Sequence, residues 1–428
     1  MTRDYIYRYL PFDRTDSRLT IFAIVFLVLF NTQIKIIEPT HGFGVIKFTL
    51  CAISCAMLIT VNLRATKAVL IGLIYVSYQL LQASFFPETF RWSTVLFSML
   101  LVGTYINFYN LVYVKEVFTI DRFIRLLKWI MMAFFVVCVA QQVCLLLGIH
   151  YLPILNITRY LNRGIGCDSL SMEPSTFARM MLACYYIYVK CCEYRRGEGP
   201  FSLTQLFAGE HKWVTVRFLW MMLTMGSGTA FVCLILFSLY FVRKNNWFYV
   251  VPLMVMIYLI LPLLPFEQLQ RATSAIELTS NLDVGGLREA DSSAASRLAP
   301  VINSVNADFT DVSNWFGHGI DKSPGIYEGT MFYSYGLILL LIAWLLDFSC
   351  AYHFLSLATL FMFAGVGGGA GTNIYYAWGI MMLYTVQRYF HDKMRDEECA
   401  MSHRSMSQRC HRGQEEQRAI IAQEREIR

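Results

Sequence analysis

The feature that most constrains this chain is a series of long apolar runs separated by short polar connections. A run of roughly 17–25 apolar residues can cross a bilayer core about 30 Å thick, and we count about twelve such runs. They lie near residues 19–38, 43–63, 68–86, 92–114, 126–148, 174–192, 213–226, 228–243, 247–265, 331–347, 350–366 and 373–390. The chain is 56% hydrophobic and only 15% charged, which excludes an ordinary soluble domain. The sequence therefore predicts an all-α, polytopic integral membrane protein.

The distribution of lysine and arginine predicts how these helices are oriented, because basic residues concentrate in cytoplasmic connections. With the N-terminus in the cytoplasm, the inner connections and the tail carry most of the basic residues. The outer connections carry only Arg91, Arg159, Arg163, Arg271, Arg288, Arg297 and Lys322. Both termini are therefore expected in the cytoplasm. The first apolar run has no small-residue cleavage site, so we interpret it as a helix and not as a signal peptide.

The apolar runs divide the chain into four parts. These are 1–265, with nine predicted spans and an outer loop at 149–172; a large outer loop at 266–330; 331–390, with three further spans; and a solvated cytoplasmic tail at 391–428. Two of the runs are short and meet at Gly226-Ser227-Gly228, so they form either two helices or one long broken helix.

Cysteines, histidines and net charge exclude several other classes of site. Most of the 12 cysteines fall in predicted helices or on the cytoplasmic side, and Cys167 is alone on the outer side, so we expect no disulfide partner for it. There is no CxxC or HExxH motif and the loop histidines are isolated, so no metal site or cofactor is predicted. The net charge of +6 is spread over inner connections and the tail, which favours contact with anionic lipid and not with nucleic acid.

A polar and charged stretch at 163–175 is the first candidate site, because it leads directly into an apolar run. Arg159 and Arg163 stand four apart on one face of a predicted short helix, where like charges repel unless an anion lies between them. Snorkelling of both side chains to lipid phosphates is the alternative. Glu173 stands at the mouth of the next helix, before Pro174.

Arg179 lies one or two turns inside that next helix, four residues after Ser175. An arginine at membrane depth is a functional candidate by default. The ordinary alternative is that it pairs with an asparagine or a carbonyl group of a neighbouring helix.

The large outer loop at 266–330 is the second candidate site, because connections of that length are generally functional or disordered. Helical spacing at 267–278 and 292–305 favours order. Acidic residues outnumber basic ones in this loop, so a simple patch for anionic lipid is not expected. Arg288 and Arg297 are therefore candidates for a specific role, with an ion pair inside the loop as the alternative for each.

Three blocks of sequence together resemble one family. The stretch Arg163…Gly…Glu173-Pro174-Ser175 resembles the "R…G…EPS" segment of bacterial O-antigen polymerases and related capsule or exopolysaccharide polymerases. The turn Thr224-Met225-Gly226-Ser227-Gly228-Thr229 resembles the "TGSxT" turn of that family. Ser296-Arg297-Leu298, the turn Gly317-His318-Gly319 and the pair Gly336-Leu337 resemble its large-loop pattern: an arginine-bearing helix, a GxG turn, then a helix opening with Gly-Leu.

The resemblance implies about twelve transmembrane helices around one large, partly helical periplasmic loop. It also implies a metal-independent glycosyltransferase of the inner membrane, which joins oligosaccharide repeat units carried on undecaprenyl diphosphate. The growing glycan would be the donor and one incoming lipid-linked repeat unit the acceptor. Membrane lipids surround such a protein, and a chain-length regulator is a possible partner.

The resemblance also suggests roles for individual residues. Arg163 and Arg297 would hold the diphosphate, because the guanidinium fork binds two phosphate oxygens and stays charged. Glu173 would act as a base or would orient an arginine. The remaining candidates are assigned to substrate binding: Arg159, Ser175, Arg179, Arg288 and His318.

Two departures from the family pattern leave alternatives open. Pro300 and Val301 occupy the region where the family often has a tryptophan, and His318 does not match the late-loop histidine of the related ligases. An O-antigen ligase, which uses a lipid A-core acceptor, is the alternative within the superfamily. A flippase or transporter of the same glycolipid is the alternative from another class.

Overall fold

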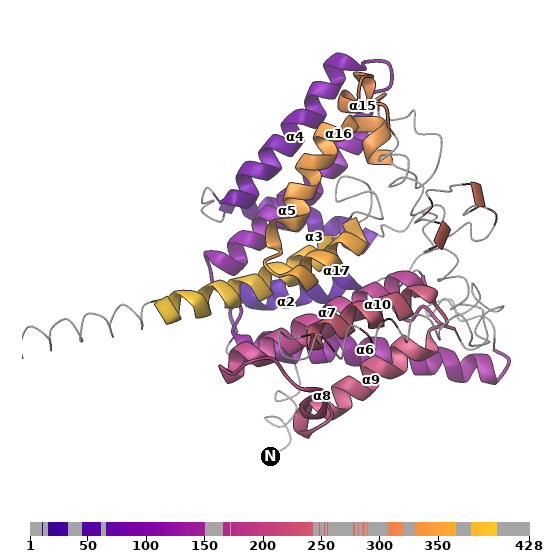
Figure 1. Ribbon diagram of the computed structural model, residues 1–428. Helices are drawn as coiled ribbons and strands as arrows, with labels where there is room; N and C mark the ends of the chain where they lie inside the picture. The colour runs from indigo at the N-terminus through magenta and orange to yellow at the C-terminus, as the bar shows by residue number, and fades with distance from the viewer. Residues whose placement is uncertain are drawn as a thin grey trace, which may run out of the picture.

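The computed structural model describes residues 16–32, 45–60, 66–149, 166–171, 173–242, 307–319, 330–364 and 378–399, with isolated positions elsewhere (Figure 1). Every element in these ranges is helical, which confirms the all-α class. The α-helices are α2 Arg18–Asn31, α3 Val45–Thr60, α4 Lys67–Phe85, α5 Trp92–Tyr113, α6 Ile120–Leu146, α7 Pro174–Arg196, α8 Leu203–Leu206, α9 Lys212–Thr224, α10 Gly228–Ser238, α15 Ser313–Phe316, α16 Thr330–Asp347 and α17 Phe354–Ala364. Short 3-10 helices are η2 Gly209–His211, η3 Leu239–Phe241 and η5 Phe348–Cys350, and residues 378–399 are also helical.

Membrane-spanning character is supported by four of the described helices, which are long and apolar enough to cross a bilayer. They are Lys67–Phe85, Val95–Tyr113, Ile120–Leu146 and Phe332–Cys350. Shorter apolar helices lie at Arg18–Asn31, Lys47–Leu58 and Gly228–Phe241. Helices α7 and α9, which cover the predicted runs at 174–192 and 213–226, are not among these apolar helices. The predicted run at 247–265, most of the two outer loops and the tail beyond 399 fall outside the described residues, so the count of about twelve spans stays a prediction.

The sequence sets the helix ends through capping groups. The hydroxyl of Ser17 accepts a hydrogen bond from the backbone N–H of Thr20, and Thr66 and Thr119 cap α4 and α6 in the same way. At the other end of α7, Gly197 adopts a left-handed conformation with φ 67°, and its N–H donates to the carbonyl of Glu193. Gly226, with φ 69°, separates α9 from α10, so the two short apolar runs are two helices and not one broken helix.

Helix α7 is buried along most of its length. Every residue from Pro174 to Val189 is buried, and the helix packs on α6, α9, α10 and α17 (Figure 1). Its tyrosines find polar partners on these neighbours: the hydroxyl of Tyr185 lies 2.8 Å from Thr215, and that of Tyr188 lies 2.8 Å from His211. Buried polar groups need such partners, so the neighbouring helices accommodate a helix that is less apolar than the four candidate spans.

Charged contacts bring together several segments that the basic-residue distribution predicts on the cytoplasmic side. Lys128 lies 2.7 Å from Glu210, and Arg195 pairs with Asp121 at 3.6 Å. Three further contacts join the same set of segments: Arg122 with Asp16, Lys393 with Glu116, and Tyr113 with Asp392. The start of α6, the end of α7, the η2 turn and the helix at 378–399 therefore meet at one end of the bundle.

Candidate functional site

The motif stretch before α7 is anchored to α6 by Gln141. Its side-chain Nε2 donates to Oδ1 of Asp168 at 2.9 Å, and its Oε1 accepts from the backbone N–H of Ser169 at 2.8 Å. The hydroxyl of Ser169 donates to the carbonyl of Phe134, also on α6, at 2.6 Å. Asp168 and Ser169 are buried, and Ser169 has a positive φ of 50°. This arrangement fixes the chain a few residues ahead of Glu173.

The next residue of α6, Gln142, reaches the second motif block. Its Nε2 donates to Oγ1 of Thr224 at 2.7 Å, and its Oε1 accepts from the indole Nε1 of Trp220 at 3.1 Å. Thr224 ends α9 and opens the Thr224–Thr229 turn. Two neighbouring glutamines on one helix therefore hold two of the three motif blocks.

Cys167 also contacts α6, where a second thiol lies beside it, although both cysteines are free in the structure. Its Sγ lies 3.1 Å from Sγ of Cys138, and both side chains are buried. The hydrogen bond with Cys138, followed by burial, raises the pKa of the Cys167 thiol. The sequence analysis placed Cys138 inside a span and Cys167 on a loop. It did not anticipate that residues 166–171 run back alongside the helix.

Glu173, Ser175 and Arg179 gather at the start of α7. Glu173 is the N-cap residue, with extended φ and ψ, and the hydroxyl of Ser175 donates to its Oε2 at 3.2 Å. Arg179 is 5% exposed and bends back toward the same turn, where its Nε donates to the carbonyl of Ser175 and its Nη2 to the hydroxyl of Thr176, each at 3.2 Å. A carboxylate, a hydroxyl and a guanidinium therefore share the first turns of one buried helix.

His318 lies in a different part of the molecule, on the turn that follows α15. Its ring stacks on the ring of Tyr333 with centroids 4.2 Å apart, and its Nδ1 lies 3.1 Å from the carbonyl oxygen of Tyr333. A carbonyl oxygen only accepts, so Nδ1 carries the proton and Nε2 keeps its lone pair in the neutral ring. The backbone N–H of His318 donates to that same carbonyl at 2.9 Å.

The turn around His318 is held by α16 and α4. Helix α16 is interrupted at Gly336, with φ 77° and ψ 177°, so its long apolar part begins at Leu337. This break agrees with the helix expected to open at the Gly336-Leu337 pair. On the other side, Nε2 of Gln82 in α4 donates to the carbonyl of Phe316 at 2.6 Å.

The structure therefore places the candidate residues in two groups. Glu173, Ser175 and Arg179 lie together at the start of α7, whereas His318 follows α15 and contacts α16. Helices α15 and α16 lie apart from α7 in Figure 1. The remaining candidates fall outside the described residues: Arg159, Arg163, Arg288 and Arg297. Within the described ranges, no group of three or more His, Cys, Asp or Glu side chains is placed to hold a metal ion.

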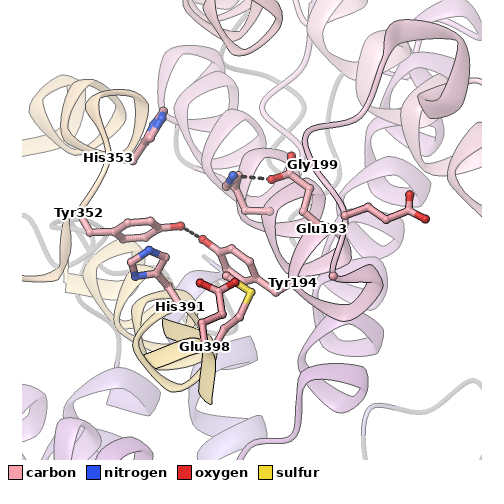
Figure 2. A pocket seen from close by; sticks show the side chains of 11 residues that line it. Glu193, Tyr194, Gly199, Tyr352, His353, His391 and Glu398 are labelled. Atoms are coloured by element: carbon pink, nitrogen blue, oxygen red, sulfur yellow. Dashed lines mark hydrogen bonds and ion pairs between the residues drawn. The ribbon is translucent and has the colours of Figure 1, made fainter. Parts of the chain in front are cut away.

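A cavity of about 500 Å³ lies at the other end of α7, and the sequence analysis missed it (Figure 2). Its lining includes Lys190, Glu193, Tyr194, Tyr352, His353, His391 and Glu398. The hydroxyls of Tyr194 and Tyr352 are hydrogen-bonded across it, and the ring of His391 stacks on Tyr352 with centroids 4.1 Å apart. Three distant segments supply its walls, so no local pattern could have revealed it. None of the motif blocks contributes to it.

Comparison with known proteins adds no assignment to this geometry. No protein-family model, curated protein or solved structure matches the chain. The three motif blocks and the arrangement of the described residues are therefore the features that indicate a function.

Proposed function

We propose that this protein is a membrane-embedded glycosyltransferase that polymerises oligosaccharide repeat units carried on undecaprenyl diphosphate. The reaction takes place at the periplasmic face of the bacterial inner membrane and serves O-antigen, capsule or exopolysaccharide synthesis. The observation that carries the proposal is the contact of Gln141 with Asp168 and of Gln142 with Thr224. These two contacts place both stretches against the same turn of α6, as expected if they contribute to one site.

The chemistry requires cations at the leaving group. Cleavage of the bond between the anomeric carbon and the phosphate releases a lipid diphosphate, whose developing charge is stabilised by fixed positive groups. Arg163 and Arg297 are proposed for this role, with Arg159 and Arg288 assisting in substrate binding. Guanidinium forks hold phosphate oxygens in pairs, and no metal ion or cofactor is then needed.

The attacking group is a sugar hydroxyl of the incoming repeat unit, which must lose its proton. Glu173, the carboxylate of the motif at the start of α7, is proposed to accept this proton as a general base. Ser175 and Arg179 keep this turn ordered through the hydrogen bonds described above. The other possible role of Glu173 is to orient an arginine.

Substitution separates the two roles of Glu173. The Glu173→Gln variant keeps the size of the side chain and its hydrogen-bond acceptor oxygen but cannot take a proton. It should abolish transfer if the carboxylate is the base, and it should retain partial transfer if the side chain only orients an arginine.

Deletion of the gene tests the proposal in a strain that attaches the glycan to lipopolysaccharide. We expect core plus one repeat unit on a gel in place of the ladder, because units are made and exported but not joined. Bare core with long chains on the carrier lipid would identify a ligase. Single units trapped on the carrier at the cytoplasmic face would identify a flippase. Either of these patterns would overturn the proposal.

A further inference from the structure

Cys138 and Cys167 form a pair of thiols that no role in glycosyl transfer explains. Their sulfur atoms are 3.1 Å apart, and the side chains are 0% and 4% exposed. Cys138 lies on the part of α6 between Phe134 and Gln141, which are the two residues that fix Ser169. The thiols therefore meet because three hydrogen bonds hold residues 166–171 in register with α6.

Whether two such cysteines form a disulfide depends on the side of the membrane on which they lie. The distribution of lysine and arginine predicts that the chain enters residues 166–171 from the outer side, where disulfides form and persist, and Cys138 lies in the half of α6 nearer to that side. In a disulfide the sulfur atoms are about 2.05 Å apart, so the two thiols must approach by only about 1 Å more.

We propose that Cys138 and Cys167 form a disulfide that ties the motif stretch to α6. The oxidant is a disulfide, carried either by an outer-compartment protein or by a small molecule. The exchange converts the two cysteine thiols and this disulfide into the Cys138–Cys167 disulfide and two thiols of the oxidant. The thiolate of Cys167 first attacks the oxidant, which releases one thiol and leaves a mixed disulfide. Cys138 then attacks the sulfur of Cys167, and the second thiol leaves with the remaining proton.

The burial of both side chains determines at which stage of folding the disulfide forms. A thiol must be deprotonated to attack a disulfide, and the environment of the folded pair raises the pKa of Cys167. An oxidant also cannot reach two enclosed sulfur atoms. The exchange therefore takes place while residues 166–171 dock onto α6 during folding, and the finished disulfide is then shielded from reductants.

Peptide mapping tests the proposal in the full chain, taken from membranes of cells quenched in acid. The protein is denatured in sodium dodecyl sulfate so that buried thiols become accessible, and free thiols are then blocked with N-ethylmaleimide. Digestion with trypsin follows without reductant. Cleavage yields one peptide, 164–179, with Cys167 as its single cysteine, and another, 129–159, which contains Cys138 and Cys144. We expect these two peptides to be joined, to separate on treatment with dithiothreitol, and to leave little maleimide on Cys167.

Two variants locate the bond. Cys144→Ser should keep the joined peptides, because Cys144 lies on the same tryptic peptide but is not the partner, whereas Cys138→Ser should lose them. Complete blocking of Cys167 by maleimide in the untreated wild-type protein would overturn the proposal, and that result depends on no variant. A joined peptide that persists in Cys138→Ser would overturn it as well. Neither outcome bears on glycosyl transfer, so the proposed function is tested separately.

Discussion

Gly317 and Gly336 lie against each other's chain segments, and each position has room only for glycine. Gly317 has φ 88°, and a Cβ there would collide with the carbonyl oxygen of Ser334. Gly336 has φ 77°, and a Cβ there would collide with the carbonyl oxygen of Trp315. The turn that follows α15 thus docks against the break in α16 where only glycine fits, and this contact holds the turn that carries His318.

Alanine at either glycine should therefore destabilise the folded protein. Backbone strain at such positions costs about 1–3 kcal/mol, and the collision with a carbonyl group adds to it. We expect a lower midpoint of thermal unfolding in detergent for Gly317→Ala and for Gly336→Ala. The control is Gly199→Ala, since a Cβ at Gly199 meets nothing within 4 Å. Wild-type unfolding temperatures in both variants would contradict the docking described here.

Removal of the Gln141 side-chain amide should loosen the motif stretch. Gln141→Met deletes the contacts with Asp168 and Ser169 and leaves buried polar groups without these partners. Each such group costs about 1–3 kcal/mol. We expect a lower unfolding temperature and a loss of polymer, measured on the same preparations. Val143→Ala, at an exposed position two residues further along α6, should change neither, and equal behaviour of the two variants would contradict the anchoring role.

Several features of this region followed from the sequence. The polar stretch before Pro174 predicted a helix start there, and α7 begins at Pro174. The first turn of a helix tolerates the missing N–H of a proline such as Pro174, so the residues next to the boundary were enough to predict it. The apolar run predicted at 331–347 coincides with α16, whereas the break at Gly336 was suggested only by the family resemblance.

Contacts that depend on tertiary packing did not follow from the sequence. The pairing of Cys138 with Cys167 needs residues 166–171 to lie alongside α6, and no periodicity in the chain encodes that placement. The cavity around His353 and His391 joins the end of α7 to two later segments. Residues so far apart in sequence carry no shared pattern, so only the three-dimensional arrangement reveals the site.

Polymer formation should depend on both the charge and the shape of the two arginine side chains proposed to bind diphosphate. Arg163→Ala and Arg297→Ala should each abolish polymer while protein levels on immunoblots stay unchanged. Lysine at either position should restore only part of the activity, since the planar fork is lost. Arg91→Ala is the matched control, because Arg91 is an exposed arginine of a predicted outer connection. Full activity of both alanine variants would sink the proposed role.

Glycosyl transfer should proceed without a divalent cation, since arginines are proposed to balance the charge of the leaving diphosphate. Purified protein supplied with lipid-linked repeat units should extend chains in excess chelator as fast as in its absence. The measurement is the length distribution of the carrier-linked glycan. A complete loss of extension that added metal reverses would reveal a cation site beyond the described residues.

The ionic cluster of Glu210 with Lys128 and Arg195 should give the protein a defined sensitivity to acid. Partial burial alone would raise the pKa of Glu210, but hydrogen bonds and charges from Lys128 and Arg195 outweigh it and bring the pKa to about 2. A carboxyl group whose pKa is lowered by folding stabilises the protein above its unfolded pKa of about 4.5, and the stabilisation disappears as the pH falls toward 2. The side chain of Glu210 is 47% exposed, so the contribution stays below about 1 kcal/mol.

Glu210→Gln should therefore unfold at a lower temperature than the wild-type protein near neutral pH. The difference should stay constant down to a pH of about 5 and close as the pH approaches 2, because the wild-type carboxyl then becomes protonated as well. High salt should shrink the difference at neutral pH, since exposed ion pairs are screened. Scanning calorimetry in detergent over this pH range makes the measurement. A difference that persists at pH 2, or that widens as acid is added, would show that Glu210 stabilises the fold by packing and not through its charge.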